Sequence, residues 1–484
     1  MKDMKKKLCC ILCACLIFSP AVSAKEAYQN YIYNYDGMAY EEPQAYTSAG
    51  QITGHSLGIE SFNEPMDVFV AKDKKIYIAD TGNHRIVVLD NAFRLVNMIT
   101  GFVYKGQTQT FNKPQGVFVS EKNNIYIADT ENARIVVLNQ NGECVNIFDK
   151  PVSTYLTADF AYKPVKVAVD HAERIFVVSA NTLEGIIGLD PDGQFLSFYG
   201  AIPVTVGLAD AFWRMIATKE QRARTKSVIP TEYSSLDMDD GDFIFGTVSA
   251  RDKDFNKANM IRKLNPLGTD VLVRNAQWAP QGDLWYYSDS TGTMIDSVFV
   301  DAVAFDHGMY GILDGRRGRV FVYDHNGFIL FNFCGLGQQQ GLLGKPEALD
   351  HMDDTFFIAD SKYNQICVFK PTEYGELIYQ ATRLQYDRKY VESEEKWKAV
   401  LEFTSFSELA YVGVGRAYYR NGDYSNAMKY FMLGNDRYAH GRAFTLYRND
   451  FFYRNFGYLM TALVVAVAGI AFLMIRKRRK RNKT

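Results

Sequence analysis

The sequence predicts an all-β propeller of six blades, followed by a small α-helical segment and one transmembrane helix near the C-terminus. Three observations support this prediction. A pattern of short strands and turns recurs six times between residues 55 and 372. The hydrophobic period then changes from 2 to 3.6 between about residues 376 and 448, and an uncharged apolar run follows at residues 456–475.

The first 24 residues are typical of a cleavable signal peptide, with a lysine-rich start, an apolar run and the small residues Val22, Ser23 and Ala24 at the cleavage site. A lipoprotein signal is the alternative, because residues 12–15 (LCAC) resemble a lipobox. Residues 25–54 form an N-terminal extension. The alternation of residues 31–35 (YIYNY) favours an added strand that closes the ring of blades.

The repeats are clearest where residues 62–89 return 49 positions later as residues 111–138. Weaker copies begin near residues 163, 236, 303 and 345. Each unit alternates short Val, Ile, Tyr and Phe runs with turn clusters such as Asn141-Gly142, the pattern of successive strands and turns. One such unit cannot bury both of its faces alone, so the units must stack around an axis. The sequence therefore predicts a propeller over residues 55–372.

These copies resemble the NHL-repeat family, whose pattern places a Pro before the inner strand and then a Val-Ala-Asp-Thr-x-Asn-x-Arg-Ile run. Blades one, two and six match this pattern, whereas blade three lacks its Asp and Arg and blade four keeps only its hydrophobic spacing. The resemblance to bacterial NHL-repeat proteins implies scaffolding or recognition, and it names no ligand.

A polar set recurs inside the repeats and invites a catalytic interpretation. An active site needs one such set, whereas a lock between blades needs one per blade, so we expect a structural role. The residues concerned are Asp80, Asn83 and Arg85, their copies Asp129, Asn132 and Arg134, and Asp360.

Candidate binding residues lie at the axis and in two inserts. Strand direction predicts that side chains near the starts of the inner strands converge on the axial mouth, where propellers hold ligands; these are Asp67, Lys166, Ser235 and Glu347. Two units carry inserts near residues 206–228 and 274–297, and loops on a rigid ring often bind ligands. The aromatic candidates there are Trp213, Trp278 and Trp285.

Residues 376–448 have the spacing of a tetratricopeptide repeat, with Tyr411, Gly415 and Phe431 at packing positions. Tyr390 and Trp397 stand 34 positions before Tyr424 and Phe431, which suggests a partial earlier copy. Two roles remain open for this segment: a stalk that sets the distance of the propeller from the bilayer, or a docking surface for a partner.

Residues 456–475 are long enough to cross a bilayer as a helix, since about 20 residues at a rise of about 1.5 Å span the roughly 30 Å hydrocarbon core. The basic tail at residues 476–484 stays in the cytoplasm under the positive-inside rule. We therefore expect a single-pass protein of the cell membrane, with residues 25 to about 455 outside the cytoplasm.

Composition argues against several functions. Between residues 25 and 475 there are 43 Lys and Arg against 54 Asp and Glu, so we expect no nucleic-acid partner. After removal of the signal peptide, Cys144, Cys334 and Cys367 remain, without the spacing of a zinc site. We expect three small buried residues, with a Cys334–Cys367 bridge as the alternative. No nucleophile, phosphate or metal motif is recognisable, and we expect no cofactor.

Three functions fit these features. The first is a non-enzymatic surface protein that binds a protein or cell-envelope ligand and holds it near the membrane. The second is a propeller enzyme of the lactonase or amidating-lyase type with a metal at the axial mouth, although no set of convergent ligands can be assigned. The third is an accessory or sensor subunit of a membrane transport complex.

Overall fold

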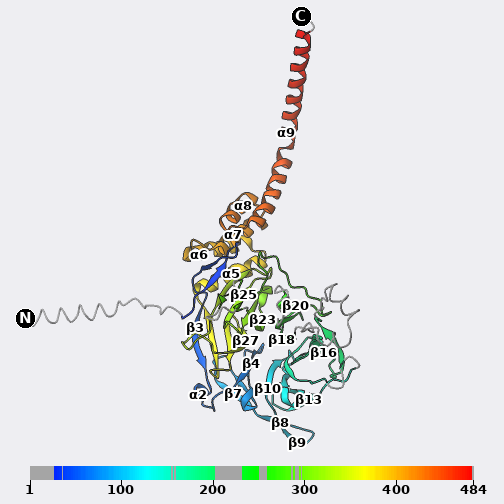
Figure 1. The fold of residues 1–484 in the computed structure, drawn as a ribbon, viewed down its shortest axis with the longest axis vertical. Coiled ribbons are helices and arrows are strands. Elements are labelled where there is room, and N and C mark those ends of the chain that lie inside the picture. Colours follow the sequence, from blue (N-terminus) through cyan, green and yellow to red (C-terminus); the bar gives the residue numbers. More distant parts are fainter. Residues whose placement is uncertain are drawn as a thin grey trace, which may run out of the picture.

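The computed structural model describes residues 27–34, 36–153, 156, 160–201, 232–249, 259–284, 287–288, 294–295 and 297–481. A β-propeller carries a group of helices, and one long helix extends away from them (Figure 1). The predicted signal peptide and the first insert lie outside the described residues.

Six antiparallel sheets surround the propeller axis, and each is one blade. Blades 1 and 2 consist of β4 (Pro65–Val70), β5 (Ile76–Asp80), β6 (Arg85–Leu89) and β7 (Leu95–Ile99), then β10 (Pro114–Val119), β11 (Ile125–Asp129), β12 (Arg134–Leu138) and β13 (Cys144–Phe148). Blades 3 and 4 consist of β14 (Pro164–Val169), β15 (Ile175–Ser179), β16 (Ile186–Leu189) and β17 (Phe195–Tyr199), then β18 (Glu232–Met238), β19 (Ile244–Ser249) and β20 (Ile261–Leu264). Blades 5 and 6 consist of β23 (Phe299–Ala304), β24 (Tyr310–Asp314), β25 (Arg319–Tyr323) and β26 (Ile329–Phe333), then β27 (Pro346–Met352), β28 (Thr355–Asp360), β29 (Gln365–Pro371) and β3 (Tyr46–Ile52).

The central strands are buried on both faces because each blade is packed between two neighbours. In β5, Ile76 and Ile78 enter a core shared with blade 6, while Tyr77 and Ala79 enter a core shared with blade 2. Burial on both faces explains why β-branched and aromatic residues predominate in the central strands, as in β5 with Ile76, Tyr77 and Ile78.

The ring closes by pairing the N-terminal extension with the last repeat. Strand β3 forms the outer strand of blade 6 through antiparallel pairing with β29. The prediction that residues 31–35 close the ring was wrong, because β1 (Tyr31–Tyr33) pairs with β2 (Ala39–Glu41) and lies against β26 of blade 5. Strand alternation alone did not distinguish between these two sites of attachment.

Several short elements lie outside the strands of the six blades. They are the helix α2 (Gly54–Leu57), the hairpins β8 (Gly101–Tyr104) with β9 (Gln107–Thr110) and β21 (Tyr287–Ser288) with β22 (Met294–Ile295), and the 3-10 turns η1 (Thr81–Asn83), η2 (Thr130–Asn132) and η4 (Asp306–Gly308).

Four helices pack on the side of blades 5 and 6: α5 (Glu373–Tyr386), α6 (Tyr390–Phe403), α7 (Glu408–Arg420) and α8 (Tyr424–Leu433). One hydrophobic core continues from these blades into the helices and includes Phe331, Phe356, Tyr379, Trp397 and Val414. The helices are therefore fixed to the propeller rather than attached by a free linker.

The helices form two successive hairpins. The turn between α5 and α6 contains Arg388 at φ 64°, and the turn between α7 and α8 contains Gly422 at φ 84°, 34 positions later. Gly415 lets α7 approach α8, since a Cβ there would lie 2.7 Å from a ring carbon of Phe431. The structure thus contains an earlier helix pair in full, where the sequence suggested only part of one.

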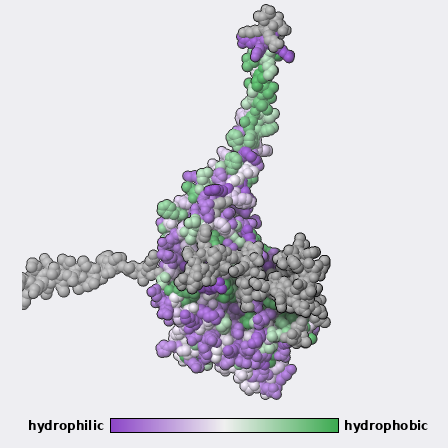
Figure 2. Space-filling model, in the orientation of Figure 1, coloured by the Kyte–Doolittle hydropathy of each residue, from purple (hydrophilic) through white to green (hydrophobic). Residues whose placement is uncertain are grey.

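Helix α9 (Arg437–Arg481) begins in the helical group and continues well beyond it (Figure 1). Its first turns pack on α8, where Ala443 shares a core with Ala427 and Phe431. Further along it carries an apolar stretch with a mean hydropathy of 2.5, none of it buried, which Figure 2 shows as a band of hydrophobic colour. By length and composition this helix can cross a membrane.

The three cysteines of the described residues are unpaired; Cys334 and Cys367 are buried as expected, whereas Cys144 is only half-buried. Cys144, Cys334 and Cys367 are all free thiols, which excludes the alternative of a Cys334–Cys367 bridge in this structure. The Cys334 thiol donates to the carbonyl of Gly341 at 3.3 Å, and the Gln365 amide donates to the Cys367 sulfur. Burial raises the pKa of both thiols, so neither is activated as a nucleophile.

Candidate functional site

The propeller axis holds a buried cluster of charged and polar side chains. Lys166 donates to Asp67 at 2.5 Å and to Asp301 at 3.2 Å, and the Ser235 hydroxyl donates to Asp301. We call these four residues the axial cluster. Each of them occupies the same position of its inner strand, as the pairing register of the blades shows.

Sequence reasoning placed three of these residues correctly and missed Asp301. The predicted fourth member, Glu347, stands instead at a strand irregularity between Pro346 and Ala348, where it accepts from Ser361 and pairs with Lys345. Because adjacent strand residues point to opposite faces, an error of one residue exchanges a channel residue for a residue on the other face. Ala348 takes the equivalent inner-strand position in blade 6.

In the axial cluster, one lysine faces two carboxylates. Burial raises the pKa of Asp67 to about 6, and Lys166 opposes that rise. Burial alone would lower the pKa of Lys166, yet Asp301 and Asp67 together raise it above its ordinary value. Asp67 Oδ2 accepts the backbone N–H group of Val117 at 2.9 Å, and Asp301 Oδ2, which Lys166 also contacts, accepts that of Leu349 at 2.8 Å. The arrangement joins blades across the axis.

A second layer of acidic groups lies two residues further along the inner strands. Burial, with repulsion from Asp350, raises the pKa of Asp237 to about 7, and burial raises that of Asp350 to about 8. Each also accepts backbone N–H groups, from Ala304 at 2.8 Å and from Val70 at 2.6 Å respectively. No group of three or more His, Cys, Asp or Glu suited to a metal ion occurs among the described residues.

The recurring polar set ties each turn to the chain that enters its blade. Asp80 accepts from Asn83 at 2.9 Å, from Arg85 at 2.6 Å and from the backbone of Asn63 at 2.7 Å. Asp129 repeats the arrangement with Asn132 and Arg134, both at 2.8 Å. Asp360 accepts from the backbone of Gly344 and Lys345.

At this turn, a direct bond to the neighbouring blade comes from the residue after the Asp. The Thr81 hydroxyl donates to the carbonyl of Pro114 at 2.6 Å, and the Thr130 hydroxyl donates to the carbonyl of Pro164 at 2.7 Å. Each bond joins a turn of one blade to the first residue of the next inner strand. The predicted structural role is therefore shared by two residues: the Asp forms hydrogen bonds within its own blade, and the Thr that follows it bonds to the next blade.

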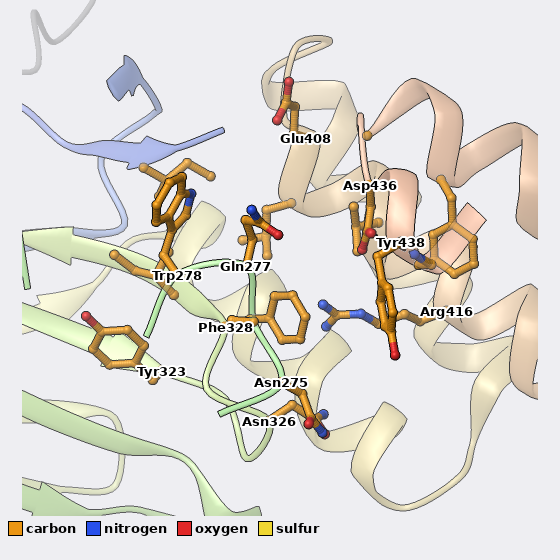
Figure 3. Close-up of a pocket in the computed structure, with 18 of the residues that line it drawn as sticks. Asn275, Gln277, Trp278, Tyr323, Asn326, Phe328, Glu408, Arg416, Asp436 and Tyr438 are labelled. Atoms are coloured by element: carbon orange, nitrogen blue, oxygen red, sulfur yellow. Dashed lines mark hydrogen bonds between the residues drawn. The ribbon is translucent and has the colours of Figure 1, made fainter. Parts of the chain in front are cut away.

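A large cleft separates the propeller from the helical group, and we call it the interdomain cleft (Figure 3). Its volume is 920 Å³, within the range of about 300 to 1,000 Å³ that is usual for ligand sites. One wall consists of the β1–β2 hairpin, residues 274–284 and the turn between β25 and β26. The other wall consists of α7, the ends of α5 and α8, and the start of α9.

The β1–β2 hairpin is held in this wall by a buried carboxylate. Asp283 accepts from the hydroxyls of Tyr31 and Tyr33, the latter at 2.7 Å, and forms an ion pair with Arg317. Burial, with the adjacent Asp283 charge, raises the pKa of Tyr33 above its ordinary value, so the tyrosine remains a donor. The anchored hairpin gives the cleft a fixed rim.

Trp278 lies on that rim and is the one predicted insert tryptophan that the structure describes. Its indole N–H donates to the carbonyl of Asn34 at 3.2 Å, and Gly37 approaches its ring so closely that a Cβ would lie 2.9 Å from it. Its side chain is still 37% exposed and faces the cleft (Figure 3). Trp213 and Trp285 lie outside the described residues.

The floor of the cleft is formed where α7 meets blade 5. The Arg416 guanidinium lies 3.6 Å from the ring centroid of Phe328 and donates to buried Asp324 at 3.3 Å. Burial lowers the pKa of Arg416, an effect that Asp324 opposes. Asp324 also accepts from the backbone of Asn326 and Phe328, so it fixes both the turn and the arginine.

Two donor sites at this floor are unsatisfied. Among the described residues, Arg416 Nη2 and His325 Nδ1 are buried without a hydrogen-bond partner. A buried polar atom without a partner is rare in folded proteins and often marks a place that water or a ligand occupies. Burial lowers the pKa of His325, the Asp324 charge opposes this, and nearby Arg416 and Arg420 lower the pKa further, so the ring is neutral near pH 7.

Sequence reasoning missed this site because its walls come from distant parts of the chain. The only residue of the site that the sequence singled out was Trp278 in the second insert. That insert does not indicate that an N-terminal hairpin and the first turns of α9 lie beside it.

Comparison with known proteins agrees with this fold. The family model of the NHL repeat matches residues 62–89 and 111–138, which form most of blades 1 and 2, and the chain is an NHL-repeat six-bladed β-propeller. No curated protein matches the sequence.

Comparison with solved structures gives matches at low identity and low TM-score. A streptogramin B lyase is 13% identical, with 68% of this chain and all of that chain covered and a TM-score of 0.41. A protein of unknown function from Bacteroides thetaiotaomicron is 12% identical over 70% and 80% of the two chains, with a TM-score of 0.41. A gluconolactonase from Xanthomonas campestris is 10% identical over 67% and 99%, with a TM-score of 0.38. At these scores the likeness carries no argument about function.

Proposed function

We propose that this chain is a binding protein of the cell membrane, anchored by α9, and that it holds a protein or cell-envelope ligand in the interdomain cleft outside the cytoplasm. The observation that carries the proposal is the pair of unsatisfied buried donors at the floor of a cleft of 920 Å³. The propeller and the helical hairpins supply two rigid walls, which is the usual design of a preformed site.

The axial cluster supports binding in the cleft rather than catalysis at the axis. A metal-dependent lactonase or lyase needs carboxylates that are available to a cation, whereas Asp67 and Asp301 are engaged by Lys166 and by backbone N–H groups. The carboxylates at the axis therefore have a structural use already.

Crosslinking from within the cleft tests the proposal. A photoreactive amino acid replaces Gln277 in the tagged full-length protein, and a matched variant carries it at Arg94, an exposed residue of blade 1 far from the cleft. We expect light-dependent crosslinks from position 277 in native membranes and none from position 94. Adding Arg420→Ala to the position 277 variant should reduce the crosslink about tenfold. Equal crosslinking from the two positions would contradict the proposal.

Membrane anchoring is tested separately. A chain truncated after Asn455 should be released from membranes by alkaline carbonate, while the full-length protein should stay in the pellet. Release of both would exclude α9 as the anchor. An integral membrane protein that co-purifies with the full-length chain, and also with the Arg420→Ala variant, would instead favour an accessory subunit of a transport complex.

A further inference from the structure

We propose that the interdomain cleft binds a carbohydrate that carries a carboxylate, with Arg416 and Arg420 receiving the carboxylate and Trp278 and Tyr438 packing against the sugar rings. This inference rests on the proposed function and adds the chemical class of the ligand. Its evidence is the charge, the amide groups and the exposed aromatic faces of the cleft lining.

The basic groups are concentrated on one helix face. Arg416 and Arg420 stand four residues apart on α7, so their side chains project from the same face about one turn apart. Asp324 engages Nη1 of Arg416 and leaves Nη2 without a partner among the described residues. Arg420 is exposed and forms no ion pair with any described carboxylate. Arg442 of α9 borders the same space.

These groups fit a carboxylate better than a phosphate. A guanidinium binds either anion through two parallel N–H groups. However, Asp436 and Glu408 also line the cleft, and Asp436 lies close enough to Arg416 to influence its pKa. Two acidic residues in the lining disfavour a doubly charged ligand more than a singly charged one, because like-charge repulsion grows with the charge of the ligand.

The rest of the lining fits sugar rings and hydroxyls. Side-chain amides line the same cleft as the arginines, and each amide both donates and accepts, as each sugar hydroxyl does; they are Asn275, Gln277, Asn326 and Gln385. Trp278 and Tyr438 keep 37% and 67% of their surface exposed, and both ring systems border the cleft (Figure 3). Exposed aromatic faces of this kind pack against the apolar C–H faces of a sugar ring.

The arrangement of these groups favours a chain of sugars over a single one. Trp278 stands on the propeller wall and Arg416 on the helical wall, with Phe328 between them (Figure 3). An occupant that reaches both must cross the floor of the cleft. An oligosaccharide with an acidic unit at the α7 side and a neutral ring at Trp278 satisfies both ends.

Calorimetric titration of the full-length protein in detergent tests the inference with defined probes. The acidic probes are tetragalacturonate and a hyaluronan tetrasaccharide, the neutral probe is the methyl ester of tetragalacturonate, and tetraglutamate is the acidic peptide. We expect one of the acidic sugars to bind. If tetragalacturonate binds, its methyl ester should bind at least about tenfold more weakly, since a hydrogen bond between charged groups is lost.

Variants assign the binding to the cleft. Arg420→Gln should weaken acidic-sugar binding about tenfold, and Trp278→Ala should weaken it as well, whereas Arg94→Gln on blade 1 should leave it unchanged. Failure of both acidic sugars to bind would overturn the inference, as would equal binding of the ester or of Arg420→Gln. Tetraglutamate binding that depends on Arg420, without sugar binding, would overturn the carbohydrate class and leave the proposed function standing.

Discussion

The axial cluster and the interdomain cleft each contain a buried positively charged side chain, but the two side chains differ in how many of their hydrogen-bonding groups have partners. Lys166 lies between two carboxylates, and every oxygen of these carboxylates accepts a hydrogen bond: backbone N–H groups donate to both carboxylates, and the Ser235 hydroxyl donates to Asp301. Arg416 has one carboxylate and an aromatic ring, and its Nη2 has no partner in the described part of the chain. A saturated network holds a fold together, whereas an unsaturated one leaves capacity for a ligand. This difference locates the candidate site.

The largest predicted effect comes from breaking the saturated network. Lys166→Met leaves Asp67 and Asp301 buried without their cation, and we expect a loss of about 3 to 5 kcal/mol in the free energy of unfolding. Urea unfolding of the full-length protein in detergent, followed by tryptophan fluorescence, measures it. Lys72→Met is the matched control, because Lys72 pairs with Glu121 and Asp240 on the surface and should cost no more than about 1 kcal/mol. Equal losses would show that the axial cluster is not a structural lock.

The second prediction concerns pH. Burial raises the pKa of Asp237 to about 7 and of Asp350 to about 8 in the folded state, from an ordinary value of 3.8. Between the ordinary pKa and these raised values the folded protein binds more protons than the unfolded chain, so the stability that these groups contribute is lost as the pH rises from about 4 to about 8 and changes no further above that. We expect the free energy of unfolding to fall between pH 5 and pH 8. Asp350→Asn should flatten that slope, and an unchanged slope would contradict the assignment.

The fold could be predicted from the sequence because the repeats report it directly. Each blade needs the same alternation of apolar residues and the same turn residues, so the clear copies allow the weaker ones to be recognised as blades. Ring closure could not be located in this way, since β3 and the β1 region both alternate like strands and the choice depends on contacts between the two ends of the chain.

The axial cluster was predictable in part, and the cleft was not. Asp67, Lys166 and Ser235 stand at equivalent repeat positions, which sequence can align. Asp301 was missed, and Glu347 was wrongly predicted, because the sequence alignment of blades 5 and 6 with the other blades was in error by one residue. An error of one residue reverses the direction of a strand side chain. The cleft has no repeat to reveal it, because the hairpin, the insert and α9 each contribute to it once.

A smaller effect is expected from the bonds between neighbouring blades. Thr81→Val keeps the shape of the side chain but leaves the buried carbonyl of Pro114 without its donor, which costs about 1 to 3 kcal/mol. Thr130→Val should cost a similar amount at the next junction. Thermal unfolding compares both with Thr108→Val, an exposed change in β9 that should have no effect. Losses as small as that of the control would show that the Thr bonds are dispensable.

The smallest effect on stability, and the sharpest contrast with Lys166, is expected at the cleft. Arg420→Ala removes an exposed side chain whose charge has no carboxylate partner among the described residues, so the free energy of unfolding should change by no more than about 0.5 kcal/mol. Ligand capture by the same variant should nevertheless fall about tenfold. Arg416→Ala serves as the comparison within the same helix, because it also strands buried Asp324 and should lose both binding and stability. If Arg420→Ala destabilised the protein as much as Arg416→Ala, Arg420 would contribute to the packing of α7. Its positive charge would then serve the stability of the fold rather than the binding of a ligand.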